Sequence, residues 1–307
     1  MKIDPADFSY LVDRALTNEQ LANMRPVIEK ELLHYDILFC LDQEGLLDKL
    51  VFQGGTALRL CYGGKRFSED LGFAGGTDFS SKQLSSMKAC IEDYLGKRYG
   101  LEVFIKEPAS LKSDPQYAEL KVDKWQISIV TAPDRKDVPR QRIKLEVANI
   151  PAYTRTTQSL LKNYDFLPDG YEDTLIYVET LNEIMADKLI ALPATRRYVR
   201  YRDFWDLIWL KQQGAVLDEK LVARKIKDYQ LTDFEQALTE RIESFSKILA
   251  SGELESEMKR FIPTDVYDRT LAKDKFLGYL DITLHELFKQ LQSRLYAEPD
   301  KGNEFLL

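Results

Sequence analysis

Two short segments carry the residue types that bind phosphates and divalent cations. Gly54, Gly55 and Thr56 follow a short apolar run, and Asp70 lies fifteen positions after Gly55. A strand, a glycine turn and a helix N-terminus place unpaired backbone N–H groups and a hydroxyl where they can hold a triphosphate. A carboxylate on the following strand could bind the Mg²⁺ that bridges the same phosphates. The spacing therefore predicts phosphate chemistry, and a plain tight turn after a strand is the alternative.

A second carboxylate is a candidate metal ligand on another predicted strand. Ile143, Leu145 and Val147 alternate with polar residues, so Glu146 lies on the opposite face from this apolar set. Glu146 could then lie beside Asp70 on the neighbouring strand. The alternative is an ordinary residue that faces solvent.

Three charged residues in the second half occupy apolar helical patterns. Lys188 lies on the apolar face of the predicted helix 181–192, where a lysine needs a partner or a ligand such as a nucleotide phosphate. A snorkelling lysine at the edge of the core is the alternative. Asp203 and Asp206 are three residues apart and share one face of an almost wholly apolar helix. They could bind Lys188, Arg202 or a metal-bound ligand, or they could form structural ion pairs with nearby arginines.

The overall charge restricts nucleic-acid binding to a local site. The chain has 43 Lys and Arg against 50 Asp and Glu, and its net charge of -7 excludes a protein that coats nucleic acid through bulk charge. The densest basic cluster has two tyrosines interleaved and comprises Arg196, Arg197, Arg200 and Arg202. Guanidinium groups suit phosphates and tyrosines stack on bases, so this cluster is a candidate RNA contact. A solvated surface is the alternative.

The pattern of elements predicts an α/β (α+β) protein of two domains. A chain of 307 residues with 44% hydrophobic content buries a sizeable core, and its length suits two domains. We predict a mixed sheet with flanking helices in residues 1–155 and a mainly helical domain in residues 156–307. The predicted strands are 51–52, 67–74, 101–105, 118–122, 125–130 and 142–147. The predicted helices are 21–50, 57–62, 78–97, 181–192, 199–213, 218–229, 233–250 and 276–296.

Cysteine usage and hydropathy predict a soluble, cytoplasmic protein without a membrane partner. Cys40, Cys61 and Cys90 have no CxxC spacing and indicate reduced thiols. No apolar run approaches 18 residues, and the first residues lack the pattern of a cleaved leader.

Four motifs in order resemble the AbiEii-type nucleotidyltransferase toxin family, which includes the MenT toxins. They are residues 52–60, 66–73, 179–189 and 202–207. The resemblance implies a DNA polymerase β-like nucleotidyltransferase fold, Mg²⁺ or Mn²⁺ as cofactor, and transfer from an NTP to an RNA acceptor, the tRNA 3′ end. It also implies a separately encoded antitoxin. On this basis we predict catalytic roles for Asp70, Lys188, Asp203 and Asp206, and nucleotide binding by Gly54, Gly55, Thr56, Arg59, Ser68 and Lys188.

One position departs from the family pattern. Family members carry a second carboxylate two residues after the first, and this chain has Gly72 there. Because positions 70 and 72 of a strand share a face, Asp70 is left alone where a metal pair about 3.5–4 Å apart would bind. An inactivating change, engineered or spontaneous, is the interpretation we favour, and a naturally degenerate site is the alternative. Two other functions stay open: a nucleotide- or partner-binding protein, and a transferase acting on a protein or small molecule.

Overall fold

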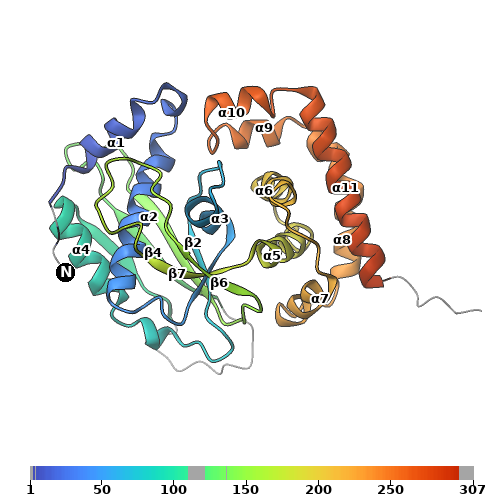
Figure 1. Cartoon of the computed structure of the whole chain (residues 1–307), viewed down its shortest axis with the longest axis horizontal. Coiled ribbons are helices and arrows are strands. Elements are labelled where there is room, and N and C mark those ends of the chain that lie inside the picture. Colours follow the sequence, from blue (N-terminus) through green and yellow to red (C-terminus); the bar gives the residue numbers. More distant parts are fainter. Residues whose placement is uncertain (1–2, 4, 110–121, 136, 297–307) are drawn as a thin grey trace, which may run out of the picture.

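The chain forms one mixed sheet followed by a helical region (Figure 1). The structure is a computed structural model that describes residues 3, 5–109, 122–135 and 137–296. The strands are β1 (Val51–Gln53), β2 (Leu71–Ala74), β3 (Val103–Lys106), β4 (Val122–Ile129), β5 (Gln141–Ala148), β6 (Arg155–Ser159) and β7 (Leu175–Glu179). The helices around them are α1 (Phe8–Leu16), η1 (Glu19–Leu21), α2 (Arg25–Gln43), α3 (Gly54–Tyr62), η2 (Ser81–Leu84) and α4 (Met87–Tyr99).

The sheet has the strand order β3-β4-β5-β2-β1-β7-β6. The pairs β2–β5 and β1–β7 are parallel, and the other neighbours are antiparallel. Alternation along β4 and β5 sends Trp125, Ile127, Leu145 and Val147 to one face, where they are buried in a core shared with α2 and α4. The opposite face carries polar residues. The mixed α/β architecture predicted from the sequence is confirmed.

The second half is a group of helices whose first member, α5, has Thr180 as its N-cap. Thr180 accepts a hydrogen bond from the Glu183 backbone N–H, and the Glu183 carboxylate accepts one from the Tyr153 backbone N–H at 2.8 Å. In Figure 1, α3 lies between the sheet and the pair α5 and α6, and it contacts β1, β2 and α5. None of the helices in the described ranges is long and apolar enough to cross a membrane. The helices are α5 (Leu181–Ala194), α6 (Tyr201–Gln212), α7 (Glu219–Asp228), α8 (Phe234–Leu249), α9 (Glu253–Met258), α10 (Thr264–Arg269) and α11 (Asp274–Tyr296).

Several predicted boundaries are wrong for local reasons. The strand expected at 67–74 begins only at Leu71, because Phe67 donates its N–H to the Phe261 carbonyl of the helical half instead of to a strand. The helix expected from 78 to 97 is divided into η2 and α4. Two strands that the sequence analysis did not predict, β6 and β7, complete the sheet, and the division into two domains stays a prediction. Residues 118–121 of a predicted strand lie outside the described ranges.

Candidate active site

The glycine turn forms an open helix N-terminus. Gly54 has φ +79°, a left-handed conformation that favours glycine, and Gln53 before it makes no side-chain hydrogen bond that caps α3. The first N–H groups of a helix have no partner within the helix. At Gly55 the requirement is space, because a Cβ there would lie 2.0 Å from Arg66 Nη2 and 3.2 Å from Ser68 Oγ. The turn therefore combines N–H groups that have no partner within the helix with close packing by Arg66 and Ser68.

The side chain of Thr56 makes a hydrogen bond within the protein. Its hydroxyl donates to the backbone carbonyl of Asp70 at 2.5 Å, and the residue is buried. A hydroxyl has one proton, so this bond leaves none for a phosphate. The Thr56 hydroxyl thus fixes the backbone of Asp70, and the part of Thr56 in holding a triphosphate stays a prediction.

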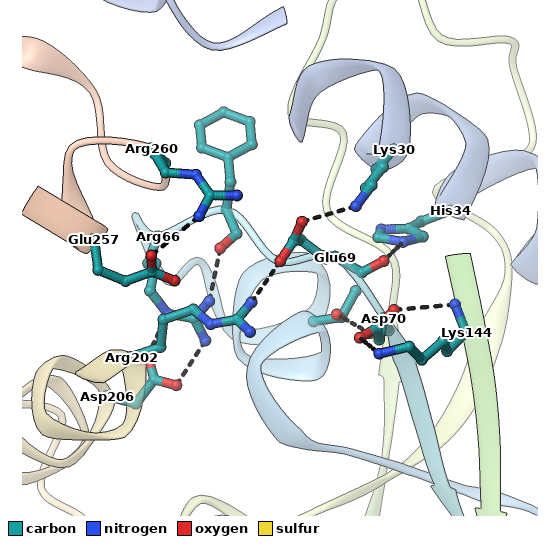
Figure 2. A network of polar contacts seen from close by, with 12 residues as sticks. Lys30, His34, Arg66, Glu69, Asp70, Lys144, Arg202, Asp206, Glu257 and Arg260 are labelled. Carbon is teal, nitrogen blue, oxygen red and sulfur yellow. Dashed lines mark hydrogen bonds and ion pairs between the residues drawn. The ribbon is translucent and has the colours of Figure 1, made fainter. Parts of the chain in front are cut away.

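Asp70 and Glu146 lie on the polar face of the sheet. Asp70 directly precedes β2, and its Oδ1 accepts a hydrogen bond from the Lys144 backbone N–H at 3.0 Å, while Lys144 Nζ lies 3.8 Å from Oδ2 (Figure 2). Gly72 in β2 pairs directly with Glu146 in β5. Glu146 in turn is 2.6 Å from Lys124 Nζ. Each carboxylate thus has a lysine partner, and sequence reasoning missed both lysines.

A buried ion-pair network connects the helical half to the glycine turn. Arg66 donates to both carboxylate oxygens of Asp206, at 2.8 Å from Nε and 2.7 Å from Nη2. Lys188 Nζ lies 2.8 Å from Asp203 and 2.7 Å from Asp206. Burial alone would raise the pKa of Asp206, but the charges of Arg66 and Lys188 lower that pKa below its usual value. The sequence analysis named three of these residues and missed Arg66, although Arg66 begins one of the quoted motifs.

The ammonium group of Lys188 lies inside this network. The side chain is 7% exposed and already has two carboxylate partners. Asp203 also pairs with Arg200 on the other side. The structure therefore brings Lys188, Asp203 and Asp206 together, and it connects them to Gly55 through Arg66.

Arg59 has only internal contacts among those described. Its guanidinium donates to both oxygens of Glu31, at 2.8 and 3.0 Å, and it stacks on the ring of Phe67 at 4.3 Å from the centroid. These contacts stabilise the packing of α3 on α2. The nucleotide-binding role of Arg59 stays a prediction.

Glu69, between Ser68 and Asp70, joins three elements. Its carboxylate accepts hydrogen bonds from Lys30 at 2.7 Å and from Arg202 at 3.1 Å, and its carbonyl oxygen lies 3.1 Å from His34 Nε2 (Figure 2). Burial raises the pKa of Glu69, but Lys30 and Arg202 bring it below its ordinary value. Sequence reasoning missed this contact because Lys30 and Arg202 lie far from Glu69 along the chain.

The family model described as "Nucleotidyl transferase AbiEii toxin, Type IV TA system" matches residues 36–281. The chain belongs to the AbiEii nucleotidyltransferase toxin family. Membership implies a nucleotide substrate and an antitoxin. No curated protein matches the chain.

One solved structure shares the fold of this AbiEii-family chain, and two others align with it less closely. MenT4, a nucleotidyltransferase toxin from Mycobacterium tuberculosis H37Rv, aligns with a TM-score of 0.50 at 15% identity, covering 95% of this chain and 100% of that one. JHP933 from Helicobacter pylori aligns with a TM-score of 0.47 at 19% identity over 88% of this chain and 93% of that one. A structure titled as a putative nucleotidyltransferase from H. pylori gives the same score and identity, over 88% and 96%.

The arginine cluster of this AbiEii-family chain is largely ion-paired. Arg196 contacts Asp233 at 2.9 Å, Arg200 pairs with Asp203, and Arg202 binds Glu69. Within the described residues, no ion pair is found for Arg197. The next residue, Tyr198, is 62% exposed, and a cavity of about 360 Å³ is lined in part by Arg196, Arg197 and Tyr198.

Proposed function

We propose that this chain is one of the toxin-type transferases that move a nucleotide from an NTP to the 3′-hydroxyl of an RNA acceptor, and that Gly72 disables this reaction in the unchanged chain. The observation that carries the proposal is the open N-terminus of α3 beside the polar sheet face. Gln53, the residue before α3, pairs with Gly72, and Gly72 pairs with Glu146, so turn and carboxylates are neighbours. A helix N-terminus is a general binding site for phosphate.

The backbone N–H groups of Gly54 and Gly55 would hold the triphosphate. Arg66 would keep the turn in place, because it packs against Gly55 while Asp206 holds its guanidinium. We assign Lys188, Asp203 and Asp206 a positioning role, since their charges are mutually neutralised in the interior. Ser68 would complete the wall of the turn. The chemistry is in-line attack by the hydroxyl on the α-phosphate, and pyrophosphate leaves.

The residues of the sheet face do not fit a pair of divalent cations. Mg²⁺ and Mn²⁺ prefer oxygen ligands with negative charge. Asp70 and Glu146 supply carboxylates, yet each already has a lysine partner, and position 72 supplies no side chain. No group of three or more His, Cys, Asp or Glu side chains able to hold a metal occurs in the described ranges. The polar sheet face of the unchanged chain therefore lacks the ligands that a metal-dependent step requires.

Transfer RNA is the acceptor that we propose. The support is Arg197 and the exposed Tyr198 at the rim of a cavity, a combination that suits a phosphate and a stacked base. Arg200, two residues after Tyr198, pairs with Asp203, which belongs to the buried network that reaches the glycine turn through Arg66.

The decisive experiment restores the missing carboxylate. A Cβ at Gly72 would have Gln53 Cγ at 3.6 Å and the Gln53 carbonyl oxygen at 3.8 Å as neighbours, which is ordinary contact. The Gly72→Asp variant should therefore fold. It is incubated with Mg²⁺, each labelled NTP in turn and total tRNA, beside the unchanged chain and the uncharged isostere Gly72→Asn. We expect label on RNA from Gly72→Asp alone.

Two results would overturn parts of this proposal. Label on RNA from the unchanged chain would contradict the disabling role of Gly72. No label from any form, with all three proteins folded, would contradict the tRNA assignment. In that case a chain that still binds NTP fits a nucleotide-binding protein, which the lysine-paired carboxylates favour as the second candidate.

A further inference from the structure

Four side-chain positions form one row across the polar face of the sheet. Gln53 in β1 pairs with Gly72 in β2, Gly72 with Glu146 in β5, and Glu146 with Lys124 in β4. Residues in direct register on neighbouring strands point to the same face. Along this row the side chains are an amide at Gln53, none at Gly72, a carboxylate at Glu146 and an ammonium group at Lys124. The gap at Gly72 lies at its centre.

Asp70 and Lys144 lie one step along the same face. Lys144 is two residues before Glu146 in β5, so both side chains leave the strand on the same side. Lys144 binds Asp70 through its backbone N–H at 3.0 Å and approaches it with its ammonium at 3.8 Å. The two carboxylates of this face are therefore matched by two ammonium groups, with Lys124 Nζ at 2.6 Å from Glu146.

The space beside Gly72 contains an amide side chain. The Cγ atom of Gln53 lies 3.6 Å from the place that a Cβ at position 72 would take. The Oε1 atom of Gln53 is buried and has no hydrogen-bond partner in the described part of the chain. A neutral amide oxygen adds no charge to the face. Neither Gln53 nor Gly72 thus replaces a second carboxylate.

We propose that Lys124 and Lys144 are the built-in counter-charges of this face and that they take the place of divalent cations in this chain. This inference rests on the proposed function, because it concerns the sheet face beside which the triphosphate would bind. Because the lysines neutralise Asp70 and Glu146, a divalent cation must compete with two tethered ammonium groups for two carboxylates. A carboxylate at position 72 would reverse this balance by adding a charged oxygen ligand between Gln53 and Glu146.

The test measures Mn²⁺ binding without nucleotide or RNA. Free Mn²⁺ is followed by electron paramagnetic resonance during titration of the unchanged chain, Gly72→Asp, the double variant Lys124→Met/Lys144→Met, and Asp70→Asn combined with Gly72→Asp. We expect Gly72→Asp to bind Mn²⁺ at least about tenfold more tightly than the unchanged chain, because charge count sets affinity for hard cations. The double lysine variant should also gain affinity, and Asp70→Asn should remove the gain of Gly72→Asp. Circular dichroism establishes that each variant is folded.

Two outcomes would overturn the inference. One is Mn²⁺ binding by the unchanged chain as tight as by Gly72→Asp. The other is a double lysine variant that binds no more tightly than the unchanged chain, which would remove the counter-charge role of Lys124 and Lys144. Gain of Mn²⁺ by Gly72→Asp without label on tRNA would support this inference while contradicting the proposed acceptor, so the two failures are distinguishable.

Discussion

The buried network and the polar sheet face use the same residue types in opposite surroundings. In the network, Lys188 and Asp206 are 7% and 4% exposed and lie 2.7 Å apart. On the face, Lys144 and Asp70 are 50% and 39% exposed and lie 3.8 Å apart. Water and salt screen the second pair and hardly reach the first. Charge in the network therefore holds structure, and charge on the face is available for exchange with a ligand.

The comparison separates residue type from role. Lys188, Asp203 and Asp206 have the types expected of catalytic residues, yet their contacts are with one another and with arginines. Lys124 and Lys144 look like ordinary surface lysines in the sequence, yet they are partners of the candidate metal ligands. The exposure of the side chains and the register of the strands decide the difference in role between these two sets of residues.

The largest effect is expected where a charge would be left buried without its partner. Asp206→Asn keeps the shape of the side chain and removes the charge that holds Arg66 and Lys188. Because a buried charge without its partner is costly, we expect the free energy of unfolding to fall by about 3–5 kcal/mol. Urea denaturation followed by circular dichroism measures this change.

Asp137→Asn is the matched control for that variant. Arg135 donates to both oxygens of Asp137, at 2.9 and 2.7 Å, so the pair has the same two-bond geometry as Arg66 with Asp206. Both partners are highly exposed. We expect no measurable change in the urea midpoint. Equal losses in the two variants would contradict the distinction between buried and exposed pairs.

The burial of His34 should make the stability of the fold depend on pH. Burial lowers the pKa of His34 from 6.5 to about 4, against the Glu69 carbonyl and the charge of Glu31, which raise it, while Lys30 lowers it further. Between these pKa values the unfolded chain binds a proton that the folded chain does not, so stability falls as pH falls from 6.5 toward 4. The contribution lost is about 3 kcal/mol.

The variant His34→Gln should remove this dependence while leaving a donor near the Glu69 carbonyl. The quantity to compare is the difference in unfolding free energy between the two proteins across pH 4–7. That difference cancels other titrating groups, including Asp36, whose pKa is raised by burial to about 6 and which has the opposite sign. A difference that is constant with pH would contradict the assignment to His34.

The same physical distinction explains what the sequence could predict. Alternation in residues 125–130 and 142–147 and helical spacing in 181–192 identified real elements, because local burial patterns dominate there. The strand β6 was missed because its sequence, Arg155 to Ser159, is polar and does not alternate. The helices α9 and α10 have six residues each, too few to show a helical period.

The candidate site was predictable only in part. Gly54, Gly55 and Asp70 follow one another closely, so local spacing was enough to group them. The position of Glu146 followed from alternation in its own strand. The partnership of Lys124 with Glu146 depends on the register between β4 and β5, and that of Lys30 with Glu69 on the packing of α2. Neither register nor packing leaves a local signal in the sequence.

Gly55 and Gly72 show the same contrast between a tightly packed position and an open one, with smaller expected effects on stability. A Cβ at position 55 would lie 2.0 Å from Arg66 Nη2, and Arg66 is held by Asp206, so Gly55→Ala should destabilise the fold by about 1–3 kcal/mol. At Gly72 the nearest atom is 3.6 Å away, and Gly72→Ala should stabilise by roughly 0.5 kcal/mol through the unfolded chain. Thermal unfolding distinguishes the two signs, and a destabilising Gly72→Ala would contradict the open space inferred there.

The smallest effect is expected on the sheet face itself. Lys144→Met and Lys124→Met should each change the free energy of unfolding by at most about 1 kcal/mol, because exposed pairs are screened by water. Asp70 also keeps its place without the ammonium, since the Lys144 backbone N–H still donates to its Oδ1 at 3.0 Å. Urea denaturation at 25 °C checks both variants, and a loss of several kcal/mol in either would show that the face is part of the stabilising interior. With stability unchanged, a gain of Mn²⁺ affinity in the double variant can come only from the removed positive charge, which is the quantity that separates this face from the buried network.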